Sequence, residues 1–116
     1  MTKSDMKRRR AALRRFLADA YGPVVMLDGP EFDGGIVGVA RTAIADDVLR
    51  FRLVYSYAKL VDALAEANGW SEEDAVDWLE FNTMRSLPYM GGEAPIVVDG
   101  LDVSEFAPPR KRRAGR

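Results

Sequence analysis

The fold is decided by residues 48–70, VLRFRLVYSYAKLVDALAEANGW. Every second residue from Leu49 to Tyr55 is large and apolar, which is typical of a strand with one buried face. Ser56 follows in the position of a helix N-cap, and apolar residues then recur at helical spacing until Gly69, which favours a left-handed end to the helix. This stretch therefore predicts a strand that runs directly into a helix.

A second helix follows, and Ser71 is expected to be its N-cap. Acidic residues fill its first turn, where the helix dipole favours anions. We expect an inward face made of Ala75, Val76, Leu79, Thr83 and Met84. Trp78, on the flank of this helix, could belong to the core or to an interface, and the core is favoured because an aromatic residue beside an apolar stripe usually packs inward. Pro88 is expected to end this helix. The two helices form a predicted hairpin, and residues 96–98 (IVV) predict a last short strand.

Two further strands are predicted on the N-terminal side of the deciding stretch. Residues 24–27 (VVML) form an apolar run that predicts a buried strand, and residues 34–40 (GGIVGVA) predict another. Gly38 indicates either a bulge or a close backbone approach. Asp46 and Asp47 predict a turn. The fold class is therefore α+β: a small three- to four-stranded sheet packed against a helical hairpin, with an N-terminal basic amphipathic helix.

Three segments are expected along the chain. Residues 1–22 predict a basic amphipathic helix with Ser4 as its cap and Gly22 at its end, which docks on the body through Phe16 and Leu17. Residues 23–100 form a compact α+β core. Residues 101–116 form a basic tail, which we expect to be disordered because its last nine residues hold no large apolar side chain.

Charge is segregated along the chain. The 116 residues carry a formal net charge of −1, with 17 basic and 18 acidic side chains. Residues 1–15 carry +6, residues 16–107 carry −12 and residues 108–116 carry +5. Two basic arms therefore flank an acidic body, and such asymmetry points to nucleic acid or another anionic partner.

Basic runs bind nucleic acid by releasing the counterions condensed on its phosphates, and such contacts carry no sequence information. The candidate contacts are Lys7, Arg8, Arg9, Arg10, Arg14, Arg15, Arg110, Lys111, Arg112 and Arg113. In the alternative view these arms are solubility tails, or they lie on the acidic body of the same or another molecule. A further alternative uses the acidic body, which resembles nucleic acid in charge and could inhibit a host nucleic-acid enzyme.

Enzyme chemistry is restricted because the chain has neither histidine nor cysteine. Disulfides, Cys/His zinc sites, cysteine nucleophiles and Ser-His-Asp triads are excluded. The remaining possible functional cluster is Asp28, Asp33, Glu80 and Asn82. Its Asp28/Asp33 loop could hold a hard cation in a minimal metal-binding enzyme, although turn formation explains the same residues. We expect no catalytic residue, no bound metal and no cofactor.

A membrane location is not expected from this sequence. It has no apolar run of about 18 residues, and no apolar segment of a signal peptide follows the basic N-terminus. We therefore expect a cytoplasmic protein without a membrane partner.

Four segments carry a resemblance to a group of small phage and prophage proteins without an assigned activity. They are FDGGIVGVA at 32–40, VYSYAKLV at 54–61, WSEEDAVDWLEFN at 70–82 and GEAPIVV at 92–98. The resemblance spans about residues 24–98, and it implies a compact α/β core and a phage-type origin in a bacterial host. It transfers no catalytic residue. Together with the basic arms, it suggests a small non-enzymatic accessory protein that binds a macromolecular partner, either nucleic acid or a host or phage protein.

Overall fold

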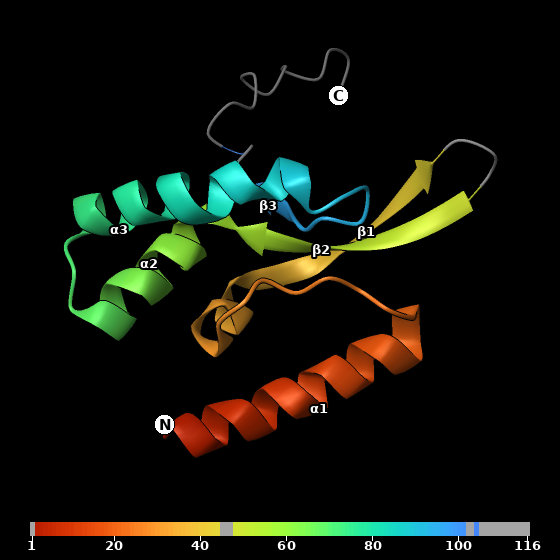
Figure 1. The fold of residues 1–116 in the computed structure, drawn as a ribbon, viewed down its shortest axis with the longest axis horizontal. Coiled ribbons are helices and arrows are strands. Elements are labelled where there is room, and N and C mark those ends of the chain that lie inside the picture. The colour runs from red at the N-terminus through yellow and green to blue at the C-terminus, as the bar shows by residue number, and fades with distance from the viewer. Residues whose placement is uncertain (1, 45–47, 102–103, 105–116) are drawn as a thin grey trace, which may run out of the picture.

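The computed structural model describes residues 2–44, 48–101 and 104 (Figure 1). It confirms an α+β fold with an N-terminal helix and a small sheet. In chain order the elements are helix α1 (Lys3–Tyr21), 3-10 helix η1 (Pro30–Gly35), strand β1 (Ile36–Ile44), strand β2 (Val48–Ser56), helix α2 (Tyr57–Asn68), helix α3 (Glu72–Trp78), π-helix η2 (Leu79–Met84), 3-10 helix η3 (Leu87–Tyr89) and strand β3 (Ile96–Val98).

The sheet has the order β1-β2-β3, with β1 antiparallel and β3 parallel to β2. The predicted irregularity at Gly38 is present, because Ile36 pairs with Tyr55 whereas Gly38 pairs with Val54. Val37 is thus an extra residue in β1, which is the pattern of a β-bulge. Nothing lies within 4 Å of the place where a Cβ of Gly38 would stand, so the glycine marks a bulge and not a close approach.

The first helix of the hairpin begins and ends at the predicted residues, and the second begins at the predicted N-cap. The Ser56 hydroxyl accepts a hydrogen bond from the Lys59 amide at 3.3 Å, and the Ser71 hydroxyl accepts one from the Asp74 amide at 3.1 Å. Gly69 ends α2 with a φ of +65°, in the left-handed region that favours glycine. These caps confirm the local predictions, because each depends on residues that are close in sequence.

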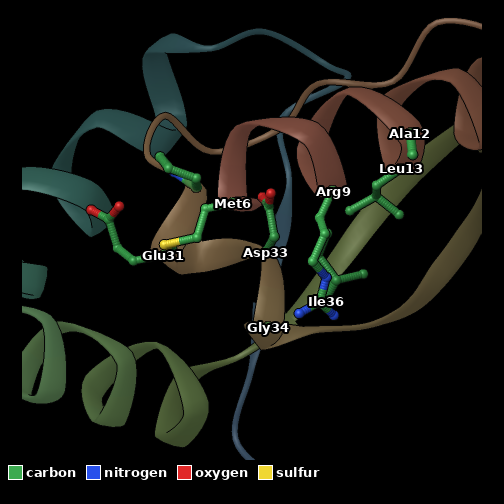
Figure 2. Close-up of a pocket in the computed structure, with 9 residues that line it drawn as sticks. Met6, Arg9, Ala12, Leu13, Glu31, Asp33, Gly34 and Ile36 are labelled. Carbon is green, nitrogen blue, oxygen red and sulfur yellow. The ribbon is translucent and has the colours of Figure 1, made fainter. Parts of the chain in front are cut away.

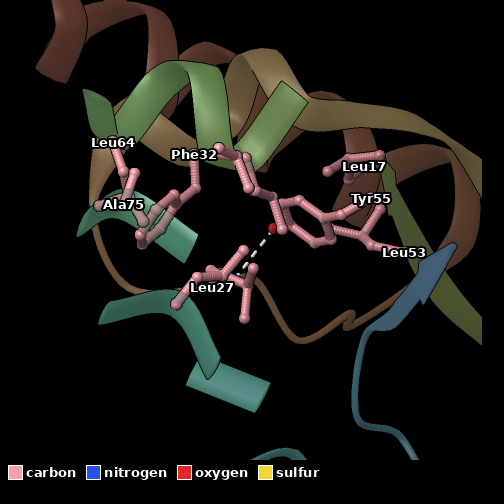
Figure 3. Packing of buried hydrophobic residues seen from close by; sticks show 10 residues of the cluster. Leu17, Leu27, Phe32, Leu53, Tyr55, Leu64 and Ala75 are labelled. Carbon is pink, nitrogen blue, oxygen red and sulfur yellow. Dashed lines mark hydrogen bonds between the residues drawn. The ribbon is translucent and has the colours of Figure 1, made fainter. Parts of the chain in front are cut away.

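The hydrophobic core lies where β2 meets the hairpin (Figure 3). Leu53, Tyr55, Leu60 and Leu79 are fully buried in it. The Tyr55 hydroxyl accepts a hydrogen bond from the Leu27 amide at 2.9 Å, so the buried phenol has the polar partner that it needs. This bond ties the segment before η1 to the central strand.

The predicted strand at 24–27 is wrong, because this segment is extended but belongs to no strand. Side chains, not a neighbouring strand, contact its backbone: Tyr55 accepts from the Leu27 amide, and the Arg10 guanidinium donates to the Leu27 carbonyl at 2.7 Å. Leu27 is nevertheless buried. An apolar run predicts burial but does not show whether another strand is available to pair with it.

The predicted strand at 34–40 is displaced along the chain. Gly34 and Gly35 belong to η1, and β1 continues beyond Ala40 to Ile44. Gly35 is the glycine that allows a close approach, because a Cβ there would stand 2.9 Å from the Leu60 side chain. The absence of a side chain at this position lets η1 pack on α2.

The second helix of the hairpin changes its hydrogen-bond pattern after Trp78. The structure confirms that Ala75, Leu79 and Thr83 face inward, but residues 79–84 form a π-helix and Pro88 lies within η3. The expectation that Trp78 is a core residue is wrong, since 37% of its surface is exposed.

The N-cap of helix α1 lies two residues earlier than expected. Thr2, not Ser4, is the N-cap, because its hydroxyl accepts from the Asp5 amide at 3.1 Å while the Asp5 carboxylate accepts from the Thr2 amide at 3.3 Å. Of the two residues expected to dock the helix, Leu17 is buried but Phe16 is 61% exposed. The predicted turn at 46–47 lies outside the described residues, and so does nearly all of the predicted tail at 101–116.

Candidate nucleic-acid interface

Three of the predicted basic contacts lie together on the exposed face of α1. Lys7, Arg14 and Arg15 are exposed, and they line a shallow groove of about 420 Å³ along the helix. Arg10, Ala11 and Ala18 line the same groove. Residues spaced by three or four positions share one side of a helix. The regular spacing of these residues therefore produces one continuous basic face.

Arg10 has a different role, because it anchors α1 to the body. Its Nη1 atom lies 3.0 Å from Oδ1 of Asp33, and its Nη2 atom donates to the Leu27 carbonyl at 2.7 Å. Only 13% of the Arg10 side chain and 16% of the Asp33 side chain are exposed. The charge of Arg10 is thus compensated inside the protein, and the exposed basic face consists chiefly of Lys7, Arg14 and Arg15.

The pKa of Asp33 reflects both its burial and the charges around it. Partial burial raises the pKa of its carboxyl group above 3.8, and the positive charges of Arg10 and Arg14 counteract part of that rise. The negative charge of Glu31 adds a smaller upward contribution. Arg10 acts on Asp33 by direct contact, and Arg14 acts on it through its positive charge alone.

Arg8 and Arg9 lie away from the groove. Arg8 is 3.8 Å from Asp5 in an exposed ion pair, which is a weak interaction in water. Arg9 extends toward η1 and lines a cavity of about 670 Å³ with Met6, Leu13 and Asp33 (Figure 2). The predicted contacts Arg110, Lys111, Arg112 and Arg113 lie outside the described residues.

The structure does not bring the second predicted cluster together. Asp28 is exposed, and Asp33 is held by Arg10. Glu80 instead accepts a hydrogen bond from the Tyr57 hydroxyl at 2.8 Å, and the Asn82 amide group donates to the Trp78 carbonyl at 2.9 Å. Within residues 2–44, 48–101 and 104, no group of three or more acidic side chains is placed to hold a metal ion. Each member therefore has a separate local environment.

No protein-family model, curated protein or solved structure matches this chain. The resemblance to small phage proteins therefore stays a prediction. In the part of the chain that the structure describes, no helix is both long enough and apolar enough to cross a membrane.

Sequence reasoning missed the anchoring role of Arg10, although a signal for it exists. Arg10 is seven residues before Leu17, so two helical turns place both on the docked side of α1. The same rule also places Arg14, three residues before Leu17, near this side, so both arginines share the signal. Only the contacts with Asp33 and with the Leu27 carbonyl single out Arg10.

Proposed function

We propose that this chain is a non-enzymatic accessory protein that binds nucleic acid through the exposed basic face of α1. The observation that carries the proposal is the joint exposure of Lys7, Arg14 and Arg15 along one groove. No acidic residue lines that groove. An anionic backbone that lies along α1 would therefore meet positive charge without local repulsion.

The geometry suits phosphate contacts. Lys7 and Arg14 are seven residues apart, which corresponds to about 10 Å along a helix. Arginine can hold a phosphate with two hydrogen bonds, and lysine acts as a point charge. Such contacts position a backbone without reading bases, so we expect binding that is independent of sequence. The basic residues 110–113 have the same chemistry and would add contacts.

Helix α1 is also anchored firmly enough to present these side chains. Leu17 is 3% exposed, and the ion pair between Asp33 and Arg10, which also lines the groove, holds the helix on the body. A helix that is fixed in this way presents its basic residues in one orientation. Less conformational entropy is then lost when a rigid anion binds.

The test is the salt dependence of binding to a short DNA duplex, measured for the full chain by fluorescence anisotropy. The variant Lys7→Gln/Arg14→Gln/Arg15→Gln should bind more weakly at low salt. Its slope of log K against log [salt] should be smaller by about 2.7, since each lost phosphate contact accounts for about 0.9.

A matched control removes the same amount of charge from the body, in the variant Arg41→Gln/Arg50→Gln/Lys59→Gln. These positions lie on β1, β2 and α2, away from the groove. We expect the control to keep the salt slope of the parent chain. Equal losses in the two variants would show that only net charge matters, and they would overturn the proposed interface.

A further inference from the structure

A second exposed groove lies on the hairpin, where α3 continues into η2. It has a volume of about 500 Å³ and is lined by Trp70, Asp74, Asp77, Trp78, Phe81 and Asn82. Trp78 is 37% exposed and Phe81 is 66% exposed. Large aromatic side chains are usually removed from water, so neighbouring exposed rings mark a candidate interaction surface.

The exposed Phe81 ring lies on the side of the helix that faces away from the core. Leu79 and Thr83 are four residues apart and lie on the buried side, whereas Phe81, midway between them in sequence, lies on the solvent side. The Asn82 amide group donates to the Trp78 carbonyl and so satisfies a backbone acceptor at this transition. Turns of π-helix occur frequently at functional sites because they are less stable than a regular α-helix. The exposed groove is therefore built into the helix itself.

The groove combines aromatic walls with negative charge. The rings of Trp70 and Trp78 lie 6.2 Å apart at an angle of 44°, which forms a preorganised apolar wall. Asp74 and Asp77 lie one helical turn apart on the rim. No basic side chain lines the groove, and among the described residues neither aspartate forms an ion pair.

An intramolecular contact beside the groove shows which chemistry fits it. The guanidinium carbon of Arg85 lies 4.9 Å from the centre of the Phe81 ring, in a cation–π contact. Phe81 still exposes 66% of its surface, so Arg85 does not cover it. The ring can therefore accept a second guanidinium group from outside the molecule.

We propose that this groove binds an arginine-bearing segment of a partner polypeptide. Arginine is planar and weakly hydrated, so its guanidinium group can stack on Trp78 or Phe81 while its N–H groups donate to Asp74 or Asp77. Lysine carries the same charge but lacks the planar fork that matches an aromatic ring and a carboxylate together. The groove thus selects for arginine over lysine, which simple charge attraction would not do.

Tryptophan fluorescence tests this directly, because both tryptophans of the chain line the groove. The full chain is titrated with an arginine–alanine repeat peptide and with a lysine–alanine peptide of the same length. We expect the arginine peptide to change the fluorescence and to bind about fivefold more tightly. Equal affinities for the two peptides would overturn the proposal, and so would unchanged fluorescence.

Two variants locate the binding on the groove. Asp74→Asn/Asp77→Asn should lower the affinity for the arginine peptide by about fivefold to tenfold at low salt. The matched control, Glu72→Gln/Glu73→Gln, removes the same charge from the same helix at residues that do not line the groove, and it should change affinity by less than about twofold. Similar losses in both variants would indicate diffuse attraction and overturn the proposal.

A third variant tests whether the arginine of the peptide stacks on the Phe81 ring. Phe81→Leu keeps an apolar side chain but removes the aromatic face, so we expect it to abolish the preference for arginine over lysine. Circular dichroism verifies that each variant keeps its helices. DNA binding by the groove variants is measured in parallel and should remain, because the basic face of α1 is separate. Failure of this proposal can thus be distinguished from failure of the proposed function.

Discussion

Helix α1 and the α3–η2 helix are both exposed on one side, but they present opposite chemistry and are held in different ways. Helix α1 is basic, and it is held by the buried Leu17, by the partly buried Leu13 and Tyr21 and by the Arg10–Asp33 ion pair. The α3–η2 helix is acidic and aromatic, and Ala75, Leu79 and Thr83 form a continuous buried stripe along it. Helix α1 thus combines apolar contacts with a partly buried charged anchor, whereas the α3–η2 helix is held chiefly by its buried stripe.

The largest expected difference between the two helices is in how much the free energy of unfolding falls when a buried leucine is replaced by alanine. Leu79→Ala should lower the free energy of unfolding by about 3 kcal/mol, because it leaves a cavity in the centre of the core. Leu17→Ala should lower the free energy of unfolding by less, since α1 can shift to fill the cavity that the substitution leaves. Urea denaturation measures both values. Equal costs would mean that α1 is as much a part of the core as the hairpin, and the comparison would fail.

A smaller effect is expected from the ion pair that anchors α1. Arg10→Gln leaves the carboxylate of Asp33 partly buried without its cation, so we expect a loss of roughly 2 kcal/mol. Arg8→Gln is the matched control, because its ion pair with Asp5 is exposed and should contribute less than about 1 kcal/mol.

A double-mutant cycle with Asp33→Asn sharpens the test of this anchor. The coupling energy between Arg10 and Asp33 should exceed about 1 kcal/mol if the pair acts as a unit. Hydrogen exchange should also show faster exchange along α1 in Arg10→Gln than in the parent chain, with the hairpin unchanged. A coupling energy near zero would mean that the apolar contacts of α1 hold the helix without the ion pair.

The smallest expected effect is the change in stability of the hairpin with pH. Partial burial of Tyr57 and the hydrogen bond from its hydroxyl to Glu80 raise its pKa to about 12, against 10.0 in the unfolded chain. A raised pKa means that the unfolded chain ionises first, so this stabilisation is complete below pH 10 and is lost as the pH rises toward 12.

Tyr57→Phe removes the titrating group and measures this contribution. The parent chain should lose more stability than the variant between pH 10 and 12, as followed by the urea midpoint. Part of the loss of stability at alkaline pH should remain in the variant, because burial also raises the pKa of Tyr55. Identical pH profiles would show that the hydrogen bond between α2 and η2 does not persist in solution.

Local features of the fold were predictable because they depend on neighbours in the chain. The caps at Ser56 and Ser71 each use an amide three residues away, and Gly69 ends α2 through its own backbone conformation. The buried positions Leu53 and Tyr55 follow from alternation within one strand. Such signals are short in range, and the structure confirms them.

Two of the predictions failed for a different reason, which is distance along the chain. Residues 24–27 were expected to form a strand, but the hydrogen-bond partners of Leu27 are the side chains of Arg10 and Tyr55, 17 and 28 residues away. The expected cluster of Asp28, Asp33, Glu80 and Asn82 separated because each found a different local environment. A residue pattern does not encode which distant group will be nearby.

The amino-acid sequence by itself determined the α+β class, the N-caps of the two hairpin helices and the separation of basic arms from an acidic body. Only the tertiary structure decided which charges remain available. It paired Arg10 with Asp33, left Lys7, Arg14 and Arg15 exposed, and turned Trp78 and Phe81 outward beside Asp74 and Asp77. The physical reason is that charge is a property of each residue, whereas burial and pairing depend on contacts between segments that are far apart in the chain.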